Sequence, residues 1–233
     1  MNYVILNGIN SNTIDGLLIQ ELPPISKPRI RTEVEEIDGR NGDILTRLGY
    51  AAYDKQMKIG LYGNFDINEV IAFFNSYGEI TFSNEPDKYY KYEIVEQIDF
   101  ERLVRFREAT VTFHMQPFKY SNTEEMLTFN TEGLSEIEVT NSGNCISKPI
   151  ITLFGSGTIN LSLNGNQLFV IDLTNDNQIT IDTNTMEAYL DGILKNRLVT
   201  GNYDNFALVE CNNTLSWSGD ITQIDIENYS RWI

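Results

Sequence analysis

The stretch IRTEVEEIDGRNGDILTRL, residues 30–48, decides how the first half of the chain folds. Two runs, residues 30–37 and 43–48, flank a GRNG corner at residues 39–42. Glycine adopts positive φ angles at little cost, so two glycines at the corner favour a β-hairpin. The two strands carry many charges and few bulky apolar residues, and the hairpin therefore has little core of its own to bury. We expect a projecting arm across residues 29–48.

The sequence around the arm predicts a β-rich domain with a single helix. Prolines at positions 23, 24 and 28 lack the N–H group that strand pairing requires, so regular pairing stops before the arm. A helix is predicted over residues 66–77, because Asp66 can cap its start and Gly78 can end it. Its apolar side chains fall at helical spacing, which predicts packing on the sheet: Ile67, Val70, Ile71, Phe74 and Tyr77. Strands are predicted at 57–61, 80–82, 89–98, 103–106 and 109–115.

The second half of the chain consists of short strands without helices. Strands are predicted at 137–140, 150–154, 158–163, 167–172, 178–182, 187–190, 206–210, 214–217 and 222–227. Asn164-Gly165 is a strong hairpin signal, and the GSG run at 155–157 is interpreted as a tight turn. Even strand spacing of this kind is typical of a sandwich or jelly roll.

The polar stretch at residues 121–125 is the expected linker between two domains. The fold class is therefore mostly β, with a first domain at 1–121 and a β-sandwich at 122–233. The sequence leaves open whether the last strand, 222–233, stays in the second domain or returns to the first.

The charge of the chain argues against several kinds of partner. The formal net charge is −16, and residues 121–233 hold 4 basic and 15 acidic residues. An acidic surface repels polyanions, so neither nucleic acid nor anionic lipid is an expected partner. No run approaches the roughly 20 apolar residues of a membrane helix, and the N-terminus lacks the pattern of a signal peptide. Synthesis in a cytoplasm is therefore expected.

Residues for catalysis or metal binding are scarce. His114 is the only histidine, and it falls within a predicted strand. Cys145 and Cys211 do not form a CxxC pair, and no phosphate-binding glycine motif is present. The oxygen-rich runs at 172–177 and 182–187 lack the spacing of a calcium loop and are better explained as turns. We therefore expect no catalytic residues, no metal and no cofactor.

Two functions remain as alternatives to a structural role. A lectin-like module could stack a sugar on Trp217 with help from Tyr203 and Trp232, although Trp217 alternates with Leu215 and is expected to face the core. A glycoside hydrolase would need two converging carboxylates. Its candidates flank turns in the second half: Asp172, Asp176, Asp182, Asp191 and Asp220.

The order of several short motifs resembles the distal tail protein family of siphophages along essentially the whole chain. In sequence order the motifs are Leu6-Asn7-Gly8, the proline-broken segment, Gly39–Gly42, the lone helix, Tyr89-Tyr90, Phe113 with Pro117-Phe118, Ser147-Lys148-Pro149, Asn164-Gly165 and Tyr229–Trp232. The individual motifs are short, and their collinear order carries the resemblance.

The resemblance implies a non-enzymatic hub in a virion tail. It implies a ring-forming first domain, usually hexameric, and a galectin-like second domain that faces outward. The ring would join the tail-tube protein to tail-tip proteins, and the outer domains would anchor receptor-binding or side-fibre proteins. The arm would reach onto the neighbouring copy through Arg29, Arg31, Gly39, Arg40, Asn41, Gly42 and Arg47. An acidic bore would also let a genome pass without binding it.

Overall fold

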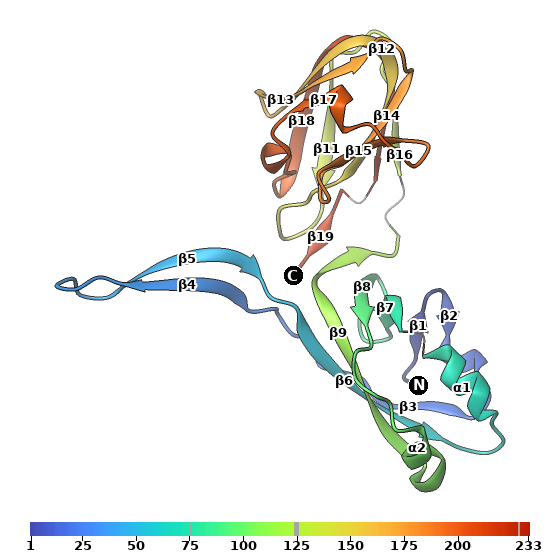
Figure 1. Ribbon diagram of the computed structural model, residues 1–233. Helices are drawn as coiled ribbons and strands as arrows, with labels where there is room; N and C mark the ends of the chain where they lie inside the picture. The colour runs from blue at the N-terminus through green and yellow to red at the C-terminus, as the bar shows by residue number, and fades with distance from the viewer. Residues whose placement is uncertain (75, 124–125, 228) are drawn as a thin grey trace. The chain divides into compact units, whose positions relative to one another are not determined.

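The computed structural model describes residues 1–74, 76–123, 126–227 and 229–233 (Figure 1). The chain divides into a first unit, Met1–Asn122 together with Ile233, and a second unit, Thr123–Trp232. Both units are built mainly from antiparallel strands, so the prediction of a mostly β protein is confirmed. The expected linker at 121–125 falls partly on residues 124–125, which lie outside the described residues.

The first unit contains one large antiparallel sheet and a separate two-stranded sheet. The strands of the large sheet are, in spatial order, β2 (Ile9–Asn10), β1 (Val4–Leu6), β7 (Tyr77–Phe82), β8 (Lys88–Glu93), β9 (Glu108–Ser121), β6 (Tyr53–Leu61) and β3 (Leu17–Glu21). The separate sheet pairs β4 (Ile30–Glu36) with β5 (Asp43–Tyr50) and is the predicted hairpin.

The core of the first unit follows the alternation of its strands. Val111, Phe113 and Met115 of β9 are fully buried, because residues two apart in a strand point to the same face. Met57 and Ile59 of the neighbouring β6 are buried beside them. The strands predicted at 57–61 and 109–115 are therefore confirmed.

The predicted helix is present but shorter than expected. Helix α1 spans Ile67–Phe73, and the side chain of Asp66 accepts a hydrogen bond from the backbone N–H of Asn68 at 2.8 Å. Val70 and Phe73 are buried on the sheet, whereas Ile71 is exposed. Tyr77 and Gly78 already belong to β7. The prediction was wrong at this end, because Tyr77 fits the helical spacing of the apolar residues although it belongs to the strand.

A second helix occupies a segment that the sequence predicted as a strand. Helix α2 spans Phe100–Phe106, and the Asp99 side chain caps it by accepting a hydrogen bond from the N–H of Arg102 at 2.8 Å. Leu103 is fully buried, and the helix ends at Arg107, which has a φ of 63°. A strand prediction fails here because short apolar runs fit both periods, and the cap at Asp99 decides for the helix.

A buried cluster of charged and aromatic groups lies in the first unit. The ammonium group of Lys119 forms an ion pair with Glu85 at 2.8 Å, and the hydroxyl of Tyr90 donates a hydrogen bond to the same carboxylate. The Lys55 ammonium donates to the carbonyl of Pro24 at 2.7 Å and lies 5.3 Å from the centre of the Tyr90 ring. Burial lowers the pKa of Lys55 to about 8.

The second unit is a β structure with the short 3-10 elements η2 (Asn196–Leu198) and η3 (Tyr203–Asn205) between its strands. A further 3-10 element, η1 (Ser11–Thr13), lies in the first unit. The strands of the second unit are β10 (Leu127–Asn130), β11 (Glu136–Asn141), β12 (Ile150–Leu163), β13 (Asn166–Leu173), β14 (Gln178–Asp182), β15 (Glu187–Leu190), β16 (Ile193–Leu194), β17 (Val199–Gly201) and β18 (Cys211–Glu227). The short last strand, β19 (Arg231–Trp232), pairs with β9 instead. The main spatial order is β10-β18-β12-β14-β15-β16, while β11 pairs with β18 and β13 pairs with β12 and β17.

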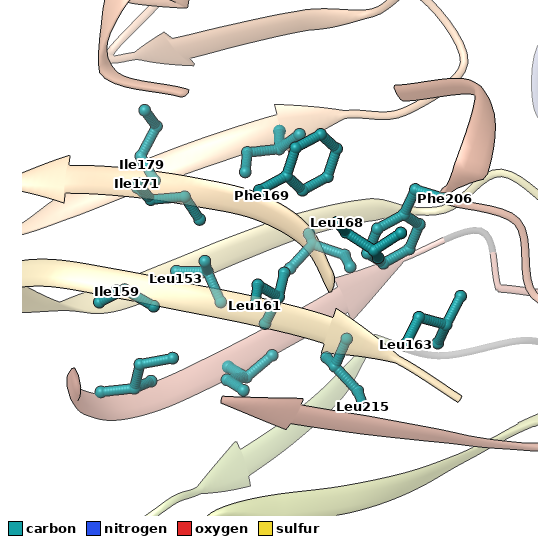
Figure 2. Close-up of a cluster of buried hydrophobic side chains, with 14 of the residues drawn as sticks. Leu153, Ile159, Leu161, Leu163, Leu168, Phe169, Ile171, Ile179, Phe206 and Leu215 are labelled. Atoms are coloured by element: carbon teal, nitrogen blue, oxygen red, sulfur yellow. The ribbon is translucent and has the colours of Figure 1, made fainter. Parts of the chain in front are cut away.

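The second unit has one large cluster of buried apolar side chains. Figure 2 shows this cluster, which includes Leu153, Leu161, Phe169 and Phe206. The rings of Phe169 and Phe206 stack with their centres 5.8 Å apart. The core thus joins β12 and β13 to the segment that follows η3.

Two long strands replace four predicted short ones. The segments 150–154 and 158–163 are both part of β12, and 214–217 and 222–227 are both part of β18. The GSG run at 155–157 is therefore not a tight turn. It coincides with a shift in the pairing of β12 with β18, so the glycines accommodate an irregularity inside a strand.

Two further predictions for the second unit have different outcomes: a turn is confirmed and a strand is not. Asn164 and Gly165 do form the turn between β12 and β13, with positive φ at both residues, as expected. The strand predicted at 206–210 is wrong, because Phe206 and Leu208 lie in a loop, where both side chains are buried. Within that segment the structure has only an isolated bridge between Leu208 and Ser147.

No helix among the described residues is long and apolar enough to cross a membrane.

The tyrosines of the first unit predict how the protein responds to alkaline pH. Burial, helped for Tyr53 by the negative charge of Glu85, raises the pKa values of Tyr53 and Tyr92 to about 12. The folded chain keeps these protons above pH 10 while the unfolded chain releases them. The stability is therefore complete below about pH 10 and is lost as the pH rises through 12.

Tyrosinate absorbance measured against pH checks this expectation. We expect some of the 12 tyrosines to ionise only near pH 12, together with unfolding, and Tyr53→Phe to reduce the amplitude of that late phase. Ionisation of all tyrosines near pH 10 in a chain that stays folded would contradict the burial described here.

Candidate inter-subunit arm

The arm, residues 29–50, is a regular β-ribbon with one irregularity. Val34 lies opposite Leu45, and Glu35 lies opposite Ile44. The pairing shifts between Arg31 and Thr32, which is a β-bulge near the base of the ribbon. A local bulge increases the twist of a two-stranded ribbon.

The tip of the arm is the predicted GRNG corner. Gly39 and Gly42 have φ angles of 81° and 80°, a region that other residues adopt at a cost of roughly 1–2 kcal/mol. The backbone N–H of Arg40 donates to the carbonyl of Ile37 at 3.1 Å, which closes the turn. Asn41 lies between the two sides and is exposed. The corner is thus a tight turn that reverses the chain and leaves Arg40 and Asn41 exposed to solvent.

One face of the arm carries apolar side chains that are exposed to solvent. Val34 and Leu45 are cross-strand partners and share this face, and Ile30 lies four residues before Val34 on the same side. Their exposed fractions are 53%, 63% and 39%, respectively. Apolar side chains gain free energy when they leave water, at roughly 25 cal/mol per Å² of buried surface. This face therefore has a driving force for contact that the isolated chain does not use.

The charges of the arm are likewise unused within the chain. Its basic residues are Arg29, Arg31, Arg40 and Arg47, and its acidic residues are Glu33, Glu35, Glu36, Asp38 and Asp43. Across the described ranges of the chain, no ion pair involves any of them. The guanidinium of Arg31 donates to the backbone carbonyl of Leu48 at 3.2 Å.

Only the base of the arm is attached to the sheet of the first unit. The backbone N–H of Ala51 donates to the carbonyl of Arg29 at 2.9 Å, where the ribbon ends and β6 begins. The ring of Tyr50 meets the ring of Phe118 in β9 edge-on, with centres 5.8 Å apart. Every residue of β4 is exposed. The arm is thus anchored at one end by an aromatic contact and one hydrogen bond.

The sequence predicted the arm's position but missed its apolar face. The sequence pattern predicted a ribbon poor in bulky apolar residues, whereas Ile30, Val34 and Leu45 are exposed on one face of it. The signal was the alternation of Ile30, Thr32 and Val34 with charged neighbours. The pairing of Val34 with Leu45 could be found only by fixing the strand register, which the two glycines of the corner do not set by themselves.

The three aromatic residues predicted for glycan contact do not form one site. Tyr203 lies in η3 with its ring centre 4.9 Å from that of Phe169, so it packs on the core. Its hydroxyl is buried without a hydrogen-bond partner in the part of the chain that the structure describes. Trp217, in β18, lines a groove that neither Tyr203 nor Trp232 of β19 lines.

The few residues with reactive side chains have local partners. His114 Nδ1 lies 2.8 Å from a carboxylate oxygen of Asp54 across the pair of β6 and β9. The thiol of Cys145 donates to the carbonyl of Arg231 at 3.2 Å, and burial raises the pKa of that thiol. Cys211 is an exposed free cysteine. Both cysteines lie in the second unit, whereas His114 lies in the first.

The acidic runs of the second unit form turns. Asp172 accepts a hydrogen bond from the backbone N–H of Thr174 at 3.0 Å, and Asp182 accepts from that of Asn184 at 2.8 Å. Asp176 forms an ion pair with Lys195 at 3.2 Å. Among the described residues, no group of three His, Cys, Asp or Glu side chains could hold a metal ion.

Comparison with known proteins places the first unit in a family. Residues 9–115 match the phage tail protein RIFT-related domain, and these residues lie within the first unit. No curated protein matches the sequence of the chain. The first unit therefore contains a domain of the phage tail protein RIFT-related type.

Solved structures extend the likeness to the whole chain. The crystal structure of the Dit protein of phage SPP1 superposes with a TM-score of 0.67 at 16% identity and covers 100% of both chains. A chain of the phage p2 baseplate in its activated, strontium-bound conformation has a TM-score of 0.51 at 9% identity and covers 97% of both chains. The chain thus has the fold of a siphophage distal tail protein, and the resemblance seen in the sequence is confirmed.

The exposure of the arm predicts that its apolar face adds nothing to the stability of a single copy. Leu45→Ser should change the free energy of unfolding of the isolated chain by less than about 0.5 kcal/mol, since the side chain touches solvent in both states. The buried control, Ile59→Ala in β6, should cost about 2–5 kcal/mol. Urea unfolding measures both changes. A loss of 2 kcal/mol or more in Leu45→Ser would show that the arm packs on its own chain.

Proposed function

We propose that this protein is the hub of a phage tail tip or baseplate, and that its first unit forms a ring, most simply a hexamer. Two observations support the proposal: the phage tail domain at residues 9–115 and the likeness of the whole chain to SPP1 Dit. The SPP1 protein is described as a paradigm of the hub adsorption apparatus in phages that infect Gram-positive bacteria. The single observation that carries the ring is the unsupported arm.

A second copy of the chain supplies the packing surface or further strand that the arm lacks. The ribbon of β4 and β5 has two open edges and an exposed apolar face around Val34 and Leu45. A two-stranded sheet is marginally stable in water and becomes stable when a further strand or a packing surface joins it. In a ring, each arm lies on the next copy and each copy receives one arm, so all the arms are covered when the circle closes.

The charges of the arm fit the same arrangement. Arg29, Arg31, Arg40 and Arg47 would pair with acidic residues of the neighbouring copy, since residues 1–120 carry 18 acidic and 13 basic residues. Gly39, Asn41 and Gly42 would shape the tip that meets that copy. Charged pairs of this kind fix the register of a contact and discourage wrong partners more than they add affinity.

The second unit would serve as an outer attachment domain. We propose that the domains divide near residue 121 and that the sandwich at 122–233 is galectin-like and faces away from the ring axis. The ring would join the tail-tube protein to the tail-tip protein, and the outer domains would carry receptor-binding or side-fibre proteins. The acidic balance of the chain suits a bore through which a genome passes without binding. The chain would be made in the cytoplasm of the host and assembled into the tail there.

Native mass spectrometry and negative-stain imaging of the purified chain test the ring. We expect a closed ring at high concentration, or on mixing with the tail-tube or tail-tip protein. The double substitution Val34→Ser with Leu45→Ser should abolish it, because the apolar face no longer gains free energy on contact. Thr46→Ser, on the opposite face of the arm, is the matched control and should still assemble.

The opposite pattern would reject the proposal. A chain that stays monomeric at every concentration and binds neither neighbouring tail protein does not form this hub. Rings that persist in the Val34→Ser and Leu45→Ser double variant would instead show that some surface other than the arm closes the circle.

A further inference from the structure

A groove of about 550 Å³ opens on the second unit between the turn that follows β10 and the middle of β18. Its lining includes Asn130, Glu132, Leu134, Trp217, Gly219 and Asp220. The ring proposed above does not use this groove.

The strand pairing explains why the groove exists. β12 pairs with β18 along most of its length. On the other side of β18, β11 pairs with residues 211–216 and β10 with residues 223–226. Residues 217–222 of β18 therefore have no strand beside them on that side, and a turn from residue 131 to 135 crosses the gap. The groove lies in this gap.

Gly219 shapes the floor of the groove. Its φ is 107°, and a Cβ atom there would stand 2.5 Å from the backbone carbonyl oxygen of Thr158 and 3.0 Å from the Cα of Ile159. Only glycine fits so close to the neighbouring backbone. The irregular stretch of β18 therefore lies close against the backbone of β12 at Gly219.

The gap interrupts the strand pairing of β18, but a further β-strand cannot pair there. The backbone N–H of Trp217 already donates to Ser135 at 2.9 Å, and the carbonyl of Thr222 accepts from the N–H of Thr131 at 3.2 Å. The hydroxyl of Thr131 donates to the carbonyl of Ile221. The turn therefore uses the backbone groups that an extended peptide would need.

The side chains of the groove provide one aromatic ring and fixed polar groups. Trp217 packs partly on the core and is half-buried, so part of its indole remains on the groove. The Asp220 carboxylate is exposed and is held by the hydroxyl of Ser156, which donates to it at 2.8 Å. The side chain of Asn130 accepts from the backbone N–H of Glu132 at 3.1 Å, which fixes the turn that bears the second carboxylate.

This set of groups matches a sugar. A pyranose has an apolar face of C–H groups, which stacks on an indole, and a rim of hydroxyl groups, which donate to carboxylates. Concave sites with an aromatic wall and a few placed polar groups are typical of small-ligand binding. No Lys or Arg lines the groove, and its two carboxylates, Glu132 and Asp220, repel phosphates and uronic acids.

We propose that this groove binds a neutral saccharide, with the sugar ring stacked on Trp217 and its hydroxyl groups donating to Asp220 and Glu132. The inference does not rest on ring formation, because the groove lies within one unit of one chain. The single turn from residue 131 to 135 and the middle of β18 build the whole site.

Fluorescence of Trp217 tests the proposal directly. The chain has two tryptophans, so Trp232→Phe leaves Trp217 as the only indole. Maltotriose, chitotriose and an oligomer of glycerol phosphate serve as probes for the full chain. We expect maltotriose or chitotriose to change the emission with a millimolar or tighter Kd, and the glycerol phosphate oligomer to leave it unchanged.

A matched pair of carboxylate variants in the same background identifies the site. Asp220→Asn should weaken saccharide binding about tenfold, because a charged acceptor is replaced by a neutral one. Asp172→Asn, an exposed carboxylate in a turn elsewhere in the second unit, should bind as the parent does. Both variants keep Trp217 and the apolar core, so both are expected to fold.

Three results would each overturn the proposal. They are an emission that no neutral saccharide changes at concentrations of about 50 mM, a response to the glycerol phosphate oligomer as strong as that to the saccharides, and equal affinities in Asp220→Asn and Asp172→Asn. None of these results affects the ring, which is measured by mass and imaging.

Discussion

A two-stranded β-ribbon has two open edges and no interior, and the arm formed by β4 and β5 is such a ribbon (Figure 1). Within the described part of its own chain, the arm is supported at the base, through Tyr50 and Phe118. The rest of the first unit has a complete core between its sheet and its helices. The chain therefore combines a domain that is stable by itself with an appendage that is not, and this contrast is the physical basis for assembly.

Local signals in the sequence predicted those elements that local chemistry decides. Two glycines fixed the tip of the arm, Asn164-Gly165 fixed the β12–β13 hairpin, and Asp66 fixed the start of α1. The buried face of β9 followed from simple alternation. In each case a single residue type or a period of two restricts the backbone whatever surrounds it, so no knowledge of the partner segment was needed.

Features that depend on distant segments could not be predicted. The glycines at 155 and 157 look like a turn, yet β12 runs through them because β18 is there to pair with it. The apolar face of the arm appears only when Val34 is set opposite Leu45. The groove beside Trp217 exists because β10 and β11 leave a gap along β18, and the sequence assigned Trp217 to the core, which it only partly joins. Strand register and strand neighbours are non-local, and sequence patterns do not encode them directly.

Hydrogen–deuterium exchange of the arm amides tests the central claim most directly, because it reports support from another copy without altering the chain. The measurement compares residues 30–50 in the monomer at low concentration with the same residues in the assembled state. The account predicts rapid exchange in the monomer and strong protection on assembly, while β9 in the core is protected in both. Strong protection of the arm in the monomer would contradict it, because the ribbon would then be stabilised by its own chain.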